Sequence, residues 1–182
     1  MKPLKPVFPW EVDVLYLAVD PAQLKSAFAY SGIDSEGNRK RGVFRVDDIR
    51  YASTVEARLV EISEGLVFSK IVLLVEYPKW NAGAAQTVRA AANVWVRLVR
   101  DLFPRKVEVR KIDPNEWQKT FSYRGRAEGT STKDYSLWLA RKAYGWEVET
   151  SDEADAAMIL EHGRTTPPTP RKKSVRKKTA TV

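Results

Sequence analysis

Two strongly apolar runs constrain the fold of this chain more than any other feature. Residues 12–20 read VDVLYLAVD, residues 70–76 read KIVLLVE, and each run ends in an acid. A strand that is apolar on both faces has to be covered on both faces, which is typical of the central strands of an α/β sheet. The two runs therefore predict an α/β fold in which helices flank a sheet.

Turn-forming residues and alternating patterns place the other strands. Residues 32–42 (GIDSEGNRKRG) are dense in turn formers and predict a hairpin loop between strands at 26–32 and 43–46. These strands and the first apolar run form an antiparallel meander. Residues 106–111 (KVEVRK) alternate as a half-exposed strand. We therefore expect a mixed sheet of five strands.

Capping residues, glycines and apolar periodicity predict the helices. Ser53 and Glu56 form a capping box before a helix that ends at a glycine, and Asp113 caps a later helix. The longest helix, 82–102, is rich in small residues, which suit core packing and a dimer contact equally. Two further helices are expected at 132–144 and from residue 151 onward.

The basic charge of the chain is concentrated at its C-terminal end. The 182 residues carry 31 Lys and Arg against 23 Asp and Glu, a net charge of +8. Residues 164–182 contain seven of these basic residues and no acid, so residues 1–163 hold 24 basic and 23 acidic residues. We expect a near-neutral folded domain at 1–163 and a disordered basic tail at 164–182. The tail is either a solvated segment or a nonspecific arm for nucleic acid.

The chain has no cysteine and one histidine, His162, which excludes several chemistries. Disulfides, thiol nucleophiles and metal sites built from Cys or several His residues are impossible. Any metal site must use mainly Asp and Glu oxygens, which suit Mg²⁺ or Mn²⁺. His162 itself is either a base near such a site or a surface residue. With no signal peptide and no membrane-spanning run, we expect a soluble cytoplasmic protein.

Four acids lie at positions that are typical of active sites in open α/β sheets. Asp20 and Glu76 end the two buried strands, and Asp152 and Asp155 share one face of a helix start. If the two strands are neighbours, the four carboxylates would repel one another unless cations neutralised them. Two divalent ions roughly 4 Å apart would do so and would suit phosphodiester hydrolysis. Each acid also has a purely structural interpretation, as a turn residue, an exposed strand end or a helix cap.

The sequence resembles the RuvC family of Holliday junction resolvases, which have the RNase H-like fold. Four segments in the family's order carry the resemblance, within about residues 12–161: LYLAVDPAQLKSAFAY, LLVEYPKW, EWQKTFSYRGRAEGTSTKDYSLWLA and SDEADAAMI. The Asp-x-x-Asp-Ala ending is the most specific of them. The GTSTKD segment and the basic tail are more similar to the bacteriophage branch of the family than to its housekeeping bacterial enzymes.

The resemblance implies a homodimeric endonuclease that cuts two opposed strands of a four-way DNA junction symmetrically. It also implies two Mg²⁺ or Mn²⁺ ions in each active site, no small-molecule cofactor and action in the cytoplasm of a bacterial host cell. By position, Asp20 corresponds to the first-strand acid, Glu76 to the fourth-strand acid, and Asp152 and Asp155 to the final helix pair. Lys133 matches a family lysine that neutralises phosphate charge near the metals.

One further part of the match has an open register, and the sequence departs from the family pattern at one place. A second family lysine falls near Gln118 or Lys119, with the register open by one residue. After the first strand, Pro21 is followed by Ala22 and Gln23, where the family usually has Gly and a small polar residue. This departure bears on how closely DNA approaches the first strand, and not on the metal site.

Basic and aromatic residues near these segments are candidates for DNA contact. The loop 122–131 is flexible by composition and carries two arginines that can enter a junction centre, although such a loop can also be merely solvated. Trp80 follows Glu76 by four residues and either stacks on an unpaired base or belongs to the core or to a dimer interface. The expected DNA contacts are Trp80, Lys119, Tyr123, Arg124, Arg126 and Lys133. The tryptophans expected in the core are Trp10, Trp95, Trp117, Trp138 and Trp146.

Three functions fit these features. The first is a RuvC-like resolvase, and the second is a broader RNase H-like nuclease that cuts flaps, forks or other branched DNA. The third is a protein that binds branched DNA without cutting it. The four acids argue against the third, because a pure binder gains nothing from a cluster of negative charge facing phosphate.

Overall fold

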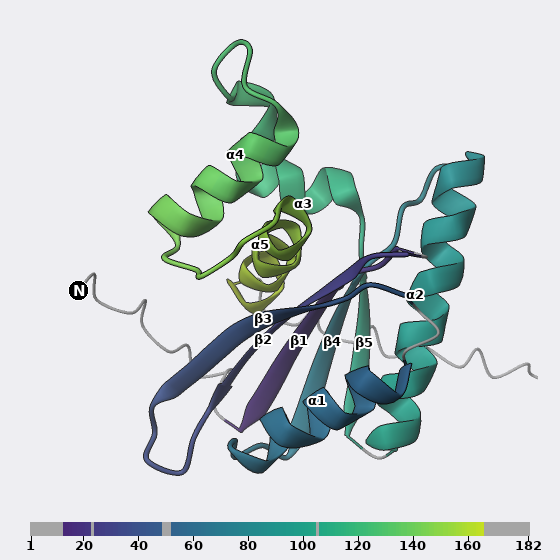
Figure 1. Ribbon diagram of the computed structural model, residues 1–182, viewed down its shortest axis with the longest axis vertical. Helices are drawn as coiled ribbons and strands as arrows, with labels where there is room; N and C mark the ends of the chain where they lie inside the picture. The colour runs from purple at the N-terminus through teal and green to yellow at the C-terminus, as the bar shows by residue number, and fades with distance from the viewer. Residues whose placement is uncertain (1–12, 23, 49–51, 105, 166–182) are drawn as a thin grey trace, which may run out of the picture.

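The five expected strands form one mixed sheet. The computed structural model describes residues 13–22, 24–48, 52–104 and 106–165. Within these residues the sheet order is β3-β2-β1-β4-β5, with β1 antiparallel to β2 and parallel to β4 (Figure 1). The strands are β1 (Val14–Asp20), β2 (Ser26–Ile33), β3 (Arg39–Val46), β4 (Lys70–Glu76) and β5 (Val107–Ile112). The predicted mixed sheet of five strands flanked by helices is confirmed.

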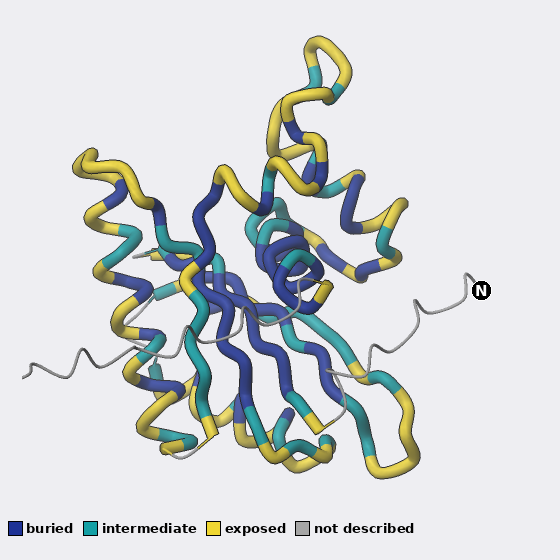
Figure 2. Tube along the Cα trace, turned by 180° about the vertical axis from the view of Figure 1, so that it is seen from behind, coloured by how far each residue is buried: buried dark blue, intermediate teal, exposed yellow. Residues whose placement is uncertain are grey.

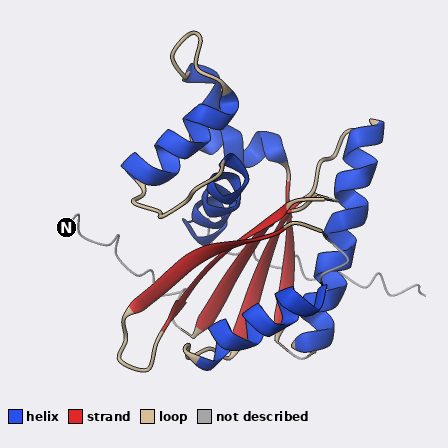
Figure 3. Cartoon of the chain, viewed as in Figure 1, coloured by secondary structure: helices blue, strands red, loops and turns tan. Residues whose placement is uncertain are grey.

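Helices cover both faces of the sheet (Figure 3). Two helices lie on one face, and the last helix lies on the other, with two short helices packed beside it. In chain order the helices are α1 (Ala52–Glu64), α2 (Gly83–Leu102), α3 (Pro114–Thr120), α4 (Thr132–Trp138) and α5 (Ser151–Thr165). A 3₁₀ turn at Tyr123–Gly125 precedes α4, and a π-helix at Leu139–Ala143 continues it. In the described part of the chain, no helix has the length and apolarity that a membrane crossing requires.

Alternation along the central strands assigns each side chain to one of the two cores. Leu17 and Val19 of β1 pack toward α1 and α2, whereas Ala18 packs toward α5. Because successive strand residues point to opposite faces, Asp20 belongs to the α5 face. The same alternation along β4 assigns Glu76 to that face. The two acids that end the apolar runs therefore face the same helix.

Small residues line the contact between helix α5 and the sheet. Ala27 and Ala29 of β2 belong to the same core as α5, and the residues of α5 from 156 to 161 are all buried. Figure 2 shows this helix as mostly buried. Near the end of the helix, a Cβ added at Gly163 would lie 2.3 Å from Cδ1 of Leu74. A Cβ at that distance would force the fully buried side chain of Leu74, or the helix itself, to shift.

Two predicted element boundaries are wrong by a few residues. Strand β3 begins at Arg39, which pairs with Ile33, so the hairpin loop is shorter than the predicted 32–42. Asp34 closes this loop, since its Oδ1 accepts hydrogen bonds from the backbone N–H groups of Glu36 and Asn38. Helix α1 begins at Ala52, which places Ser53 inside the first turn and not at the predicted cap.

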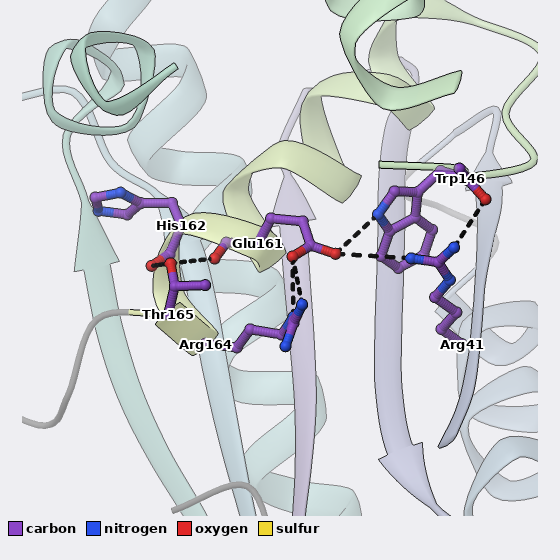
Figure 4. Close-up of polar contacts among 7 residues, drawn as sticks. Arg41, Trp146, Glu161, His162, Arg164 and Thr165 are labelled. Atoms are coloured by element: carbon purple, nitrogen blue, oxygen red, sulfur yellow. Dashed lines mark hydrogen bonds and ion pairs between the residues drawn. The ribbon is translucent and has the colours of Figure 1, made fainter. Parts of the chain in front are cut away.

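The C-terminal end of the folded domain lies beyond the predicted boundary. Arg164 is 2% exposed, and its Nε and Nη2 donate to Oε2 of Glu161 at 3.0 and 2.7 Å (Figure 4). Oε1 of the same glutamate accepts from Nε1 of Trp146 at 3.1 Å and lies 3.7 Å from Nη1 of Arg41. The boundary after residue 163 therefore falls inside α5, and Arg164 belongs to the domain. The rest of the expected tail, residues 166–182, lies outside the described residues.

The tryptophans expected in the core do not all lie there. Trp95, Trp117 and Trp146 are buried, as predicted. Trp138 is 54% exposed, because it lies on the outer side of α4 and stacks on Tyr135 with ring centroids 5.7 Å apart. Its prediction as a core residue is wrong, and Trp10 lies outside the described residues.

The contact between α5 and β4 predicts a large effect of one added methyl group. We expect Gly163→Ala to lower the free energy of unfolding by about 2 kcal/mol, because the Cβ overpacks Leu74. Gly125→Ala is the control, since a Cβ at Gly125 would meet no atom within 4 Å. Denaturant unfolding followed by circular dichroism measures both changes, and equal stability of the two variants would contradict the close packing.

Candidate active site

The structure brings the four predicted carboxylates to one edge of the sheet. Val19 of β1 pairs with Val75 of parallel β4, so Asp20 and Glu76 end neighbouring strands at the same edge. The first turns of α5 carry Asp152 and Asp155 to this edge. The negative charges of the other three acids act on Asp20, which places all four within electrostatic range of one another.

Burial and mutual repulsion disfavour the negative charges of this cluster. Burial, followed by the charges of Glu76, Asp155 and Asp152, raises the pKa of Asp20 well above its usual range. Burial also raises the pKa of Asp155 to about 7, although a hydrogen bond from Ser136 acts in the opposite direction. Burial raises the pKa of Glu76 as well, against a hydrogen bond from a tryptophan. The cluster is therefore a place where bound positive charge would be strongly favoured.

The four carboxylates have the right chemistry for a hard divalent cation, but their side chains lie too far apart to hold one. Carboxylate oxygens are the ligands that Mg²⁺ and Mn²⁺ prefer, and burial together with the neighbouring acids raises the pKa of Asp20 and of Asp155 although the charge of Lys133 lowers both. Among the described residues, however, no three acidic or histidine side chains stand close enough together to hold one ion. An ion would have to draw Asp20, Glu76, Asp152 and Asp155 closer to one another.

Two buried side chains hold the carboxylates from behind. Nε1 of Trp117 donates to Oε2 of Glu76 at 2.8 Å, and Oγ of Ser136 donates to Oδ1 of Asp155 at 2.5 Å. The sequence predicted Trp117 only as a core residue and did not single out Ser136. The one available signal for Ser136 was its position three residues after Lys133, which puts both side chains near the same face of α4.

The two candidate lysines lie on different short helices. Lys133 is exposed in the first turn of α4, which is capped by Ser131, and its positive charge acts on Asp20 and Asp155. Lys119 is exposed in the last turn of α3, and Gln118 beside it is half-buried. Lys133 is therefore the lysine whose charge reaches the carboxylate cluster.

The loop at 122–131 is more ordered in its contacts than its composition predicted. Tyr123 is 2% exposed and packs edge-on against neighbouring rings, so its side chain is covered in this structure. Its contact with DNA stays a prediction. Arg126 is half-buried and donates to the backbone oxygens of Tyr123 and Thr130, both at 2.8 Å. Arg124 is exposed. Of these three candidates, Arg124 is the one whose side chain is exposed.

Trp80 lies on the surface beside the carboxylate edge. It is 45% exposed, which excludes the core interpretation. Nη1 of Arg89 donates to the backbone oxygens of Pro78 and Trp80, at 3.0 and 2.9 Å. On the other side, the backbone N–H of Lys79 donates to Oδ2 of Asp113 at 3.2 Å. The segment that presents Trp80 is therefore held from both α2 and the start of α3.

The turn after Asp20 is closed by a serine. Oγ of Ser26 accepts from the backbone N–H of Ala22 at 3.0 Å and from Nε1 of Trp95 at 2.9 Å. Pro21 is buried, and Gln23 lies outside the described residues. Ala22 is thus tied to Ser26, which Trp95 of α2 anchors in the core.

His162 packs against α3, and its contacts do not favour the role of a base near a metal site. Its Nδ1 lies 3.0 Å from Oγ1 of Thr120, whose own proton goes to the backbone oxygen of Glu116. Nδ1 is therefore the donor in this pair, and burial lowers the pKa of the ring. These contacts favour a structural role for His162 at the junction of α3 and α5.

Comparisons with known proteins support the fold. No protein-family model and no curated protein matches the sequence. The structure is similar to RuvC of Thermus thermophilus in complex with a Holliday junction substrate, with a TM-score of 0.53, 13% identity, and coverage of 81% of this chain and 91% of that chain. A second structure of Thermus thermophilus RuvC gives a TM-score of 0.50 and 14% identity, with coverage of 81% and 92%. The fold is thus the RNase H-like fold of RuvC-type resolvases.

The raised pKa of Asp155 predicts how an amide substitution changes stability. Asp155 titrates at about 7 in the folded protein, against about 3.9 in an unfolded chain, so ionisation of Asp155 removes stability as pH rises from about 4 to about 7. In metal-free solution, we expect Asp155→Asn to be more stable than the wild type at pH 8, by about 2 kcal/mol, and to lose this advantage by pH 4. Urea unfolding in the presence of a chelator measures the difference.

The control for this effect is Asp101→Asn, an exposed acid near the end of α2. Its effect should stay within about 0.5 kcal/mol across the same pH range. A stability difference between Asp155→Asn and the wild type that did not vary with pH would contradict the raised pKa.

Proposed function

We propose that this protein is a structure-selective DNA endonuclease that resolves four-way junctions by paired, symmetric nicks. The observation that carries the proposal is the convergence of Asp20, Glu76, Asp152 and Asp155 at one edge of an RNase H-like sheet, with the charge of Lys133 beside them. The likeness to a RuvC structure solved with a Holliday junction substrate supports the choice of substrate.

The proposed chemistry is hydrolysis of a phosphodiester at this edge with two divalent ions. When bound, Mg²⁺ or Mn²⁺ would prepare the attacking water and stabilise the leaving oxygen. Asp20 and Glu76, on adjacent strands, and Asp152 and Asp155, on α5, are the residues that would hold the ions. Lys133 would offset the negative charge of the scissile phosphate, since it already acts on the carboxylates.

The proposed DNA surface surrounds the carboxylate edge. Trp80 offers a partly exposed ring for base stacking, and Lys119, Arg124 and Lys133 offer exposed positive charges for phosphates. Arg126 supports this surface indirectly, because it holds the loop that presents Arg124. Symmetric cutting of two opposed strands needs two active sites, so we propose a homodimer. The GTSTKD segment supports a bacteriophage origin.

Cleavage assays test the proposal directly. We expect the purified protein to nick a synthetic four-way junction in Mg²⁺ or Mn²⁺, at paired symmetric positions, and not to nick it in a chelator. Asp20→Asn should reduce the rate by at least about a hundredfold, because one ligand to the ions loses its charge. Asp101→Asn, an exposed acid on α2, should cut like the wild type.

The substrate panel distinguishes the neighbouring functions. Flaps, forks and linear duplex are assayed beside the four-way junction under the same conditions. Equal cutting of flaps and junctions would replace the resolvase with a broader branched-DNA nuclease. Binding of the junction by the wild type without any cutting would contradict an enzymatic function.

Substitution of Trp80 tests the proposed stacking contact. We expect Trp80→Ala to weaken junction binding by about tenfold, since stacking of one base on an aromatic ring contributes about 1–3 kcal/mol. Trp80→Phe keeps an aromatic ring and should bind nearly as well as the wild type. Fluorescence anisotropy with labelled junctions measures both affinities, and equal losses in the two variants would argue for a structural role of Trp80.

A further inference from the structure

A buried pair of hydroxyl groups extends from the carboxylate cluster into the protein. The hydroxyl of Tyr123 lies 2.8 Å from Oγ of Ser136, and the same Oγ lies 2.5 Å from Oδ1 of Asp155. Tyr123 is 2% exposed and Ser136 is fully buried. Neither residue belongs to the proposed set of metal ligands, yet both are connected to one of its members through hydrogen bonds.

The number of available protons fixes the direction of these hydrogen bonds. Ser136 has one hydroxyl proton, and the oxygens that can accept it are Oδ1 of Asp155 at 2.5 Å and the backbone oxygen of Thr132 at 3.1 Å. An ionised Asp155 is the stronger acceptor because it carries the charge. Ser136 then donates to Asp155, and Tyr123 donates to Ser136. The result is a chain of donors that ends on one carboxylate oxygen.

Packing holds this chain in place. The ring of Tyr123 lies between those of Trp117 and Tyr135, at 5.0 Å from each and nearly perpendicular to both. The hydroxyl of Tyr135 in turn donates to the backbone oxygen of Phe121 at 3.0 Å. Because Trp117 also donates to Glu76, the same aromatic cluster supports two of the four carboxylates.

We propose that Ser136 and Tyr123 are positioning residues that fix the carboxylate of Asp155 for a divalent ion. Their hydrogen-bond chain ends on Oδ1 and would hold the carboxylate in one orientation when an ion binds. Groups that hydrogen-bond a metal-binding side chain set its orientation, and their loss typically weakens metal affinity by about 10- to 100-fold. This inference rests on the proposed function and adds two residues to it.

Calorimetric titration of the full chain with Mn²⁺, without DNA, tests the proposal. We expect Ser136→Ala to bind Mn²⁺ about tenfold more weakly than the wild type. Tyr123→Phe keeps the ring and its packing but loses the hydroxyl, so its affinity should fall between those of Ser136→Ala and the wild type. Ser63→Ala is the matched control, because the hydroxyl of Ser63 donates only to a backbone oxygen of its own helix, Val60 O.

A second measurement separates positioning from general loss of structure. Junction binding in a chelator and denaturant unfolding are followed for the same variants. A positioning role requires weaker Mn²⁺ binding with junction affinity in the chelator unchanged. If Mn²⁺ and junction affinities fall together with stability, the residues act only through the fold and the proposal is overturned.

The outcomes distinguish this proposal from the proposed function. Equal Mn²⁺ affinity of Ser136→Ala and the wild type would overturn the positioning role and leave the nuclease proposal standing. Absence of Mn²⁺ binding by the wild type would overturn both. If Ser136→Ala does not fold, the Mn²⁺ affinity of Tyr123→Phe tests the positioning role in its place. An unchanged Mn²⁺ affinity in Tyr123→Phe would then overturn the proposal.

Discussion

Because β1 and β4 pair in parallel, with Val19 opposite Val75, the two apolar runs end at the same edge of the sheet. This pairing places Asp20 beside Glu76, although 55 residues separate them in the chain. An antiparallel pairing would have sent the two carboxylates to opposite edges. The alternation of strand side chains then turns both acids toward α5, so one pairing determines both their proximity and the helix that they face.

The α5 face combines close packing with unfavourable charge. Alanines on β1 and β2 and a glycine near the end of α5 let the helix lie against the sheet, and this contact carries Asp152 and Asp155 to the strand ends. The same burial that orders the helix raises the pKa of Asp155 and Asp20. Stability gained from apolar contact thus holds together acids that would otherwise move apart.

The order of apolar and acidic residues along the chain predicted the strands of the site and the acids that end them. The apolar runs identified β1 and β4, and their terminal acids identified Asp20 and Glu76. The burial of Tyr123 was not predicted because its neighbours are serine, glycine and arginine, which indicate a solvated loop, whereas the burial arises from rings elsewhere in the chain such as Trp117. Trp138 was misassigned for the opposite reason, since an aromatic residue in a helix indicates a core position unless the helix has an uncovered side.

Charge composition assigned Arg164 to the basic tail, whereas the structure places it in helix α5. Arg164 was assigned to the tail because no acid follows it, yet its guanidinium is buried against Glu161, one turn earlier in α5. A composition count cannot detect such a pair, because it depends on which face of the helix is covered. The same limit applies to the carboxylate cluster. Sequence spacing identified its four acids, but only the arrangement of α3 and α4 reveals Trp117 and Ser136, the groups that orient Glu76 and Asp155 within it.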